Sequence, residues 1–123
     1  NDKDISKVEY KTDKEPVKIR FPMLGEIESC LWKANTIGRS DIGPTPHWMK
    51  GFATLKKNDF EKIKEDYSWE AMDTDWKPEL DTNVLKFNSF RWYKSENFRP
   101  DGNLAGCFYL DFENMVVYFD VEM

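Results

Sequence analysis

Residues 100–123 carry the pattern that most constrains what this chain can fold into. Apolar and polar side chains alternate on both sides of Glu113-Asn114, which is typical of a β-hairpin with these two residues as its turn. Asn114 tolerates the positive φ that such a turn requires and Glu113 does so less readily, which leaves a longer, bulged loop as the alternative. A shift by one residue would turn every apolar side chain toward solvent, so the register is strongly specified. The predicted partners are Phe112 and Met115, Asp111 and Val116, Leu110 and Val117, Tyr109 and Tyr118, Phe108 and Phe119, and Cys107 and Asp120.

The two faces of this hairpin differ in character. One face is continuously apolar and is expected to point into the core. The other combines aromatic rings with carboxylates, which suits a cationic protein partner or a sugar, and we expect it to face outward. The alternative is that a helix or another layer covers its tyrosines. The candidate binding residues on this face are Tyr109, Asp111, Tyr118, Asp120 and Glu122.

The hairpin region also accounts for the net charge of −5. Residues 100–123 hold five acidic residues and no Lys or Arg, whereas the other 99 residues balance 18 acidic with 18 basic side chains. A protein with a pI near 4.9 lacks the concentrated basic patch that nucleic acids and anionic membranes demand. No apolar segment approaches the ~20 residues that span a bilayer. We therefore expect no nucleic-acid partner, no membrane span, and a monomer or weak oligomer.

The chain is expected to form a single domain over residues 17–123, preceded by a flexible tail or spacer at 1–16. The opening stretch mixes charges of both signs with few apolar residues, which is typical of a tether or a frayed end. Because the first residue is Asn rather than Met, a removed leader or lipid-anchor segment is an option. We expect an extracytoplasmic or envelope-tethered, lipoprotein-like protein, with a cytoplasmic protein as the alternative.

The segments before the hairpin alternate between strand-like and helix-like patterns. Period-2 alternation predicts strands at Val17–Met23, Glu26–Ile37 and His47–Lys56. A helix follows, with Asn58 as N-cap, Glu61 completing a capping box, and an apolar stripe of Phe60, Ile63 and Tyr67. Residues 69–82 are predicted to form an irregular connection, and 84–95 is prone to form a strand.

These patterns predict an α+β fold with an antiparallel sheet of five to six strands, in the order β-β-β-α-β-β-β, and one helix packed on a face. The alternative is a partly closed β-barrel with the helix as a plug or lid.

The second candidate site is the exit of the loop at residues 38–46. This loop is polar and rich in Gly and Pro, and it leads directly into an aromatic residue. Trp and Arg are common anchors of protein interfaces, so the region is a reasonable recognition surface. The alternative is that the tryptophan fills the core. The candidate binding residues are Arg39, Asp41, His47, Trp48 and Lys50.

Sequence motifs for metals, cofactors and catalysis are absent. Cys30 and Cys107 lie 77 positions apart without metal-type partners at short spacing, so we expect no metal site and no cofactor. The two thiols either bridge strands in an oxidising compartment or act as small buried apolar groups.

We therefore expect a non-enzymatic protein-binding domain, for example an inhibitor or immunity-type partner of a basic protein. One alternative is a small hydrolase that uses His47 with a nearby carboxylate or with Ser40. Another is a small-ligand carrier with a pocket between sheet and helix, walled by tryptophan rings.

Overall fold

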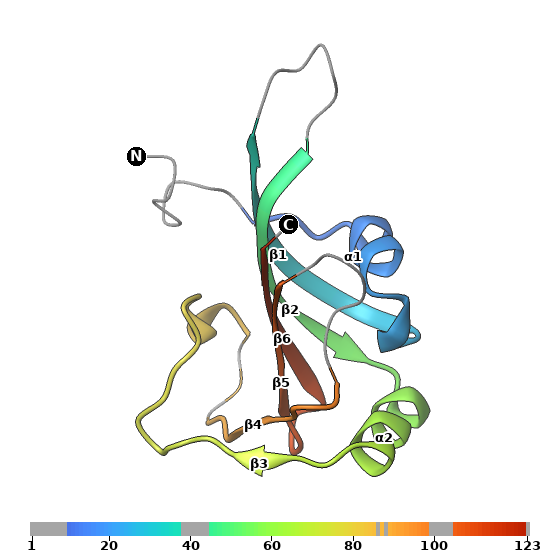
Figure 1. The fold of residues 1–123 in the computed structure, drawn as a ribbon, viewed down its shortest axis with the longest axis vertical. Coiled ribbons are helices and arrows are strands. Elements are labelled where there is room, and N and C mark those ends of the chain that lie inside the picture. The colour runs from blue at the N-terminus through green and yellow to red at the C-terminus, as the bar shows by residue number, and fades with distance from the viewer. Residues whose placement is uncertain (1–9, 38–44, 86, 88, 99–104, 123) are drawn as a thin grey trace.

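The computed structural model describes residues 10–37, 45–85, 87, 89–98 and 105–122. Six strands form one antiparallel sheet in the order β1-β2-β6-β5-β4-β3. Figure 1 shows two α-helices beside this sheet. The strands are β1 (Ile27–Ile37), β2 (Thr45–Leu55), β3 (Glu70–Ala71), β4 (Trp92–Lys94), β5 (Ala105–Asp111) and β6 (Val116–Glu122), and the helices are α1 (Lys14–Arg20) and α2 (Lys57–Asp66), with short 3-10 turns at η2 (Pro22–Leu24) and η4 (Thr82–Val84).

The predicted α+β fold is confirmed, with helices packed on an antiparallel sheet of six strands. In the described part of the chain β1 and β3 each have a neighbour on one side only, so the sheet does not close into the barrel of the alternative prediction. The C-terminal hairpin is inserted between β2 and β4. As a result β6, the last strand along the chain, pairs with β2 in the interior of the sheet.

The prediction of a first strand at Val17–Met23 is wrong, because these residues form α1 and η2. Val17, Phe21 and Leu24 are fully buried, while Ile19 is 70% exposed. Positions 17 and 21 share a face in a strand and also in a helix, and the exposure of Ile19 shows that the helical period applies. The ring of Phe21 packs edge-on against Phe108 at 5.3 Å.

The one helix that the sequence predicts is confirmed as α2, although its start differs. Lys56 is the N-cap and forms no side-chain capping bond, so Asn58 lies inside the helix instead of capping it. A different contact holds this end of the helix: Asp59 accepts a hydrogen bond of 2.9 Å from the backbone N–H of Glu26. Phe60 and Ile63 are buried, as the apolar stripe predicts.

The hairpin register is confirmed from Cys107–Asp120 through Asp111–Val116. The ladder ends there, and residues 112–115 form the turn, so the longer of the two predicted loops applies. The positive φ falls on Met115, at 56°, and not on Asn114. The turn is held by Asp111, which accepts hydrogen bonds from the backbone N–H groups of Glu113 and Asn114 at 3.0 and 3.1 Å.

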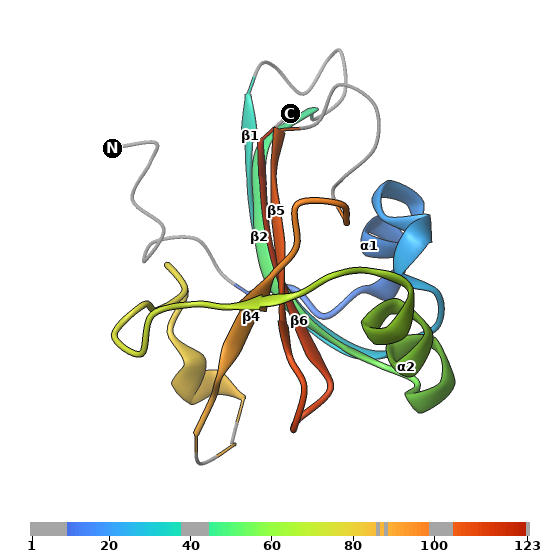
Figure 2. The same cartoon turned by 60° about the horizontal axis from the view of Figure 1, so that its bottom comes forward.

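Each face of the sheet carries its own buried cluster. The helices cover one face, where Phe108, Leu110 and Phe119 contribute to the larger core. The described residues of segment 72–91 (72–85, 87 and 89–91) cross the opposite face, as Figures 1 and 2 show, and a second core lies beneath them. Its buried members are Phe52, Leu80, Trp92, Val116 and Tyr118.

Part of the expected N-terminal tail contacts the sheet. Residues 1–9 lie outside the described residues, but Lys11 exchanges two backbone hydrogen bonds with Trp32 on the edge strand β1, at 2.7 and 2.9 Å. The helix α1 begins at Lys14. Among the described residues, no helix combines the length and the apolar character needed to cross a bilayer.

Candidate binding site

A cluster of charged side chains lies on the face of the sheet that segment 72–91 crosses. The Nζ of Lys50 is 2.6 Å from Oδ1 of Asp120 and 2.7 Å from Oε2 of Glu79. The Lys50 side chain is only 10% exposed, whereas those of Asp120 and Glu79 are 32% and 52% exposed. One nearly buried ammonium is therefore shared by two partly solvated carboxylates.

The sheet topology brings this cluster together. Lys50 on β2 lies directly opposite Asp120 on β6, and the two residues are 70 positions apart in the sequence. The third member of the cluster, Glu79, comes from segment 72–91, which crosses this face of the sheet. Its backbone N–H donates a hydrogen bond of 3.2 Å to the hydroxyl of Tyr118, which fixes the segment over the central strand.

The environment of the cluster changes three pKa values. Burial alone would lower the pKa of Lys50, but hydrogen bonds to Asp120 and Glu79 outweigh it, so the pKa is raised. Burial raises the pKa of Tyr109 to about 12, with further contributions from Cys107 and Asp120. Burial, together with the charge of Asp120, also raises the pKa of Tyr118. Lys50 therefore stays charged and both tyrosines stay neutral near neutral pH.

A hollow of about 280 Å³ lies on one side of the cluster. Asp120 and Glu122 line it together with Lys50 and the ring of Tyr109. Cys107, which is half-buried, completes one wall. The hollow thus combines two carboxylates with an aromatic ring.

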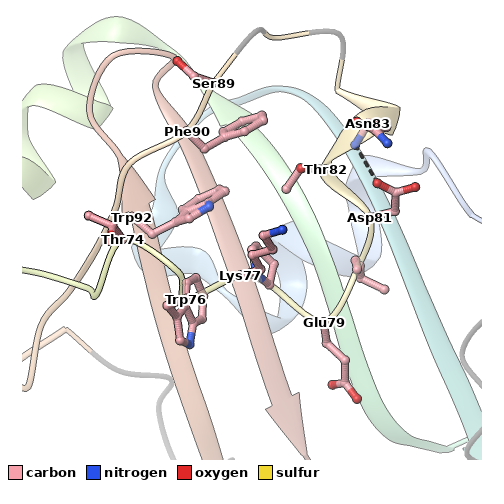
Figure 3. A pocket seen from close by; sticks show the side chains of 12 residues that line it. Thr74, Trp76, Lys77, Glu79, Asp81, Thr82, Asn83, Ser89, Phe90 and Trp92 are labelled. Atoms are coloured by element: carbon pink, nitrogen blue, oxygen red, sulfur yellow. Dashed lines mark hydrogen bonds between the residues drawn. The ribbon is translucent and has the colours of Figure 1, made fainter.

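A larger cleft of about 470 Å³ lies on the other side, between segment 74–83 and residues 89–92. Figure 3 shows the rings of Phe90 and Trp92 on one wall and the 74–83 segment curving around the opposite side. Phe90 and Trp92 stack with their centroids 5.3 Å apart and their planes 5° apart. Polar side chains form the rim: Thr74, Lys77, Glu79, Asp81, Thr82, Asn83 and Ser89.

The structure distributes the hairpin candidates over three environments. Glu122 is exposed and Asp120 is half-buried. Tyr109 is half-buried because the indole of Trp76 packs on it at 4.5 Å. Tyr118 and Asp111 are each only 1% exposed and offer almost no surface to a partner. Asp111 instead holds the turn and accepts a further hydrogen bond from the backbone N–H of Arg91 at 3.2 Å.

The candidates near the loop exit are only partly within the described structure. Arg39 and Asp41 lie outside the described residues, as does Ser40. His47 belongs to the backbone of β2, and its side chain is not described. Trp48 is 4% exposed and contacts the ammonium of Lys50, whose Nζ is 5.8 Å from the ring centroid. Of this group, Lys50 joins the hairpin candidates in one cluster, because β2 pairs with β6.

The two cysteines are free and do not form the bridge considered from the sequence. Cys30 lies on β1 and belongs to the core on the helix face. Cys107 lies on β5 opposite Asp120, on the other face. Strands β2 and β6 lie between β1 and β5 in the sheet. With ~4.8 Å between neighbouring strands, the Cα atoms of the two cysteines are farther apart than the ~7 Å that a disulfide allows. Burial raises the pKa of the Cys30 thiol, which is typical of an inert buried cysteine.

Sequence reasoning missed the residues that segment 72–91 contributes to the ion cluster and to the cleft. Glu79, Trp76 and Phe90 come from a stretch without helix or strand periodicity, so no pattern indicates which face they approach. The signal in the sequence was the pair Trp69 and Trp76, two large rings in the acidic, irregular stretch 69–82.

The described residues contain no group of three or more His, Cys, Asp and Glu side chains arranged to hold a metal ion. Comparison of the chain with protein-family models, with curated proteins and with solved structures gave no match. The arrangement of the side chains is therefore the basis for assigning a function.

Proposed function

We propose that this protein is a non-enzymatic binding domain that recognises a basic protein. The observation that carries the proposal is that the carboxylates of Asp120 and Glu79 share the ammonium of Lys50, while Glu122 lines the same hollow as Lys50 and Asp120. Lys50 neutralises one of the three negative charges, so the formal charge of this surface is negative. We call these four residues the acidic surface.

The hollow beside Asp120 and Glu122 fits the side chain of a partner's Lys or Arg. A carboxylate and a cationic donor form stronger hydrogen bonds than neutral pairs do. The ring of Tyr109 lines the same hollow and offers its face or edge to the aliphatic stem or the cation. Because Asp120 is already held by Lys50, it is positioned before a partner arrives, which reduces the entropy lost on binding.

The overall charge supports the same proposal. A chain with a net charge of −5 attracts cationic proteins at long range, and complementary charges raise the association rate more than they raise the affinity. An inhibitor or immunity-type protein paired with a basic toxin or enzyme is one concrete form. We extend the proposal to an exported or envelope-tethered location, where such pairs can meet.

The experiment compares two variants with the same change in charge. In the first, Asp120→Asn and Glu122→Gln neutralise the acidic surface and keep the side-chain shapes. In the control, Glu65→Gln and Asp66→Asn neutralise two exposed acids of α2, which packs on the opposite face of the sheet. Each protein is used to capture partners from native extract at low and high salt, and the captured protein is identified by mass spectrometry.

We expect the wild type and the α2 control to capture the same basic protein at low salt. The Asp120/Glu122 variant should associate with that partner about tenfold more slowly, with a weaker dependence on salt. Equal association rates and equal salt dependence for all three proteins would contradict the proposal. A captured partner with an acidic surface would do so as well.

A further inference from the structure

The cleft between segment 74–83 and residues 89–92 has a composition that the acidic surface does not explain. Its walls include the half-buried rings of Trp76 and Phe90, and its rim carries hydroxyl, amide, ammonium and carboxylate groups. We propose that this cleft is a binding site for a neutral carbohydrate, a mono- or disaccharide unit. The proposal rests on the cleft alone and does not depend on the basic protein partner proposed above.

The charges around the cleft are of both signs and offer no strong field to a charged ligand. Lys77 and Asp81 both line it, and among the described residues neither forms an ion pair. Their opposite charges balance. The remaining charged group, Glu79, has its carboxylate 2.7 Å from the ammonium of Lys50, which it shares with Asp120, so its negative charge is compensated only in part. The lining therefore carries charges of both signs with a small negative excess on the Glu79 side, which disfavours an anionic ligand and gives a cation only a weak attraction.

The polar groups suit a ligand with many hydroxyls. Each hydroxyl of a sugar donates one hydrogen bond and accepts others, so it needs both donors and acceptors around it. Lys77 donates, Asp81 accepts, and the side chains of Thr82, Asn83 and Ser89 do both. One oxygen of Asp81 accepts from the backbone N–H of Asn83 at 2.9 Å, a contact drawn in Figure 3 that fixes the orientation of the carboxylate.

The rings supply the apolar surface that a sugar also needs. The face of a pyranose ring presents C–H groups, and an aromatic ring packs against it while its edges remain free for polar contacts. The rings are fixed in place, because Phe90 stacks on Trp92 and Trp76 packs on Tyr109. The cleft of about 470 Å³ lies in the range of ~300–1,000 Å³ that is usual for small-molecule sites.

Several contacts fix the segment that forms one wall of the cleft. The backbone N–H of Met72 donates to the carbonyl of Trp92 at 2.9 Å, where the crossing segment leaves β3. Further along, the Lys50–Glu79 ion pair and the Glu79–Tyr118 hydrogen bond fix the segment to the sheet. A preformed cleft loses little conformational entropy when it binds.

The test is a titration of ¹⁵N-labelled protein, followed through the indole N–H signals of Trp76 and Trp92. The probes are four neutral disaccharides (maltose, cellobiose, lactose and chitobiose), with glucosamine as a cationic and glucuronate as an anionic comparator. We expect at least one neutral disaccharide to shift the Trp76 signal saturably at millimolar concentration. The two charged sugars should shift it less at equal concentration.

Three variants separate binding in the cleft from general effects. Trp76→Ala should weaken binding about tenfold, because it removes the ring surface. Asp81→Asn keeps the acceptor for Asn83 but loses the charge-assisted bond, and should weaken binding several-fold. Asp73→Asn is the matched control: Asp73 is exposed on the same segment and is not part of the cleft lining, so its variant should bind like the wild type.

The proposal is overturned if none of the four neutral disaccharides shifts the Trp76 signal. It is also overturned if a charged sugar binds best, or if Asp73→Asn weakens binding as much as Asp81→Asn. If Trp76→Ala fails to fold, as judged by the dispersion of its amide signals, the comparison of Asp81→Asn with Asp73→Asn decides.

Discussion

Replacing Lys50 by methionine removes the ammonium that joins segment 72–91 to the sheet and keeps most of the side-chain volume. Hydrogen bonds to charged groups contribute ~1.5–3 kcal/mol when buried, and exposed ion pairs only ~0.2–1 kcal/mol. The Lys50 side chain is 10% exposed but its partners are 32% and 52% exposed, so the two contacts fall between these limits. The variant also leaves two carboxylates facing each other. We expect Lys50→Met to lower the free energy of unfolding by ~2–3 kcal/mol.

The assay is urea unfolding followed by tryptophan fluorescence, with thermal unfolding alongside. For a domain of this size, ~2–3 kcal/mol corresponds to a decrease in Tm of about 10 °C. In a double-mutant cycle, Lys50→Met and Asp120→Asn should be coupled by ~1–2 kcal/mol, because each removes the partner of the other. A loss below ~0.5 kcal/mol for Lys50→Met, or additive effects in the cycle, would refute the idea that this ion cluster fixes the segment.

Three further predictions address the turn, the tyrosines and the first helix. Asp111→Ala leaves the backbone donors of the β5–β6 turn without their acceptor and should cost about 3 kcal/mol in a urea titration; a loss under ~1 kcal/mol would contradict this role. The folded protein holds the pKa values of Tyr109, at about 12, and of Tyr118 above their unfolded value of 10.0. The stability that their neutral forms provide is complete below pH ~10 and is lost as the pH rises through the folded pKa values. Ultraviolet titration should therefore show that these two tyrosines ionise only as the protein unfolds at alkaline pH. Ionisation of both tyrosines near pH ~10 in the folded protein would contradict the raised pKa values. Ile19→Lys should change the stability by less than ~0.5 kcal/mol while Val17→Lys unfolds the protein, as circular dichroism melts would show; equal damage from both would restore the strand interpretation.

The sequence pattern predicted the C-terminal hairpin well because its register has a physical cause. Every one-residue shift would expose an apolar row, and only one alignment of Phe108 with Phe119 avoids this. The same reasoning failed at Val17 and Phe21. These two positions share a face at both the strand and the helix period, so the burial of the chain around them, rather than the local pattern, decides between the two structures.

The candidate site was predictable only where the sheet determines it. Lys50 and Asp120 were both identified from the sequence, as members of two separate surfaces, and the β2–β6 pairing joins them. Glu79 and Trp76 were not identified, because an irregular segment gives no periodic signal about which side of a sheet it crosses. For the same reason the burial of Tyr118 could be weighed only as one of two alternatives.

The position of β6 in the interior of the sheet has a consequence for how the protein folds. Strands β1 and β2 lie in the first half of the sequence, but the second edge of β2 has no partner until residues 116–122 have been synthesised. Long-range strand pairing of this kind slows folding. It also leaves the unpaired edge of β2 exposed, and able to aggregate, until residues 116–122 have been made. We therefore expect newly made chains to depend on chaperones that bind unpaired strands, and nonsense mutations that remove β6 to give aggregates instead of a smaller folded protein.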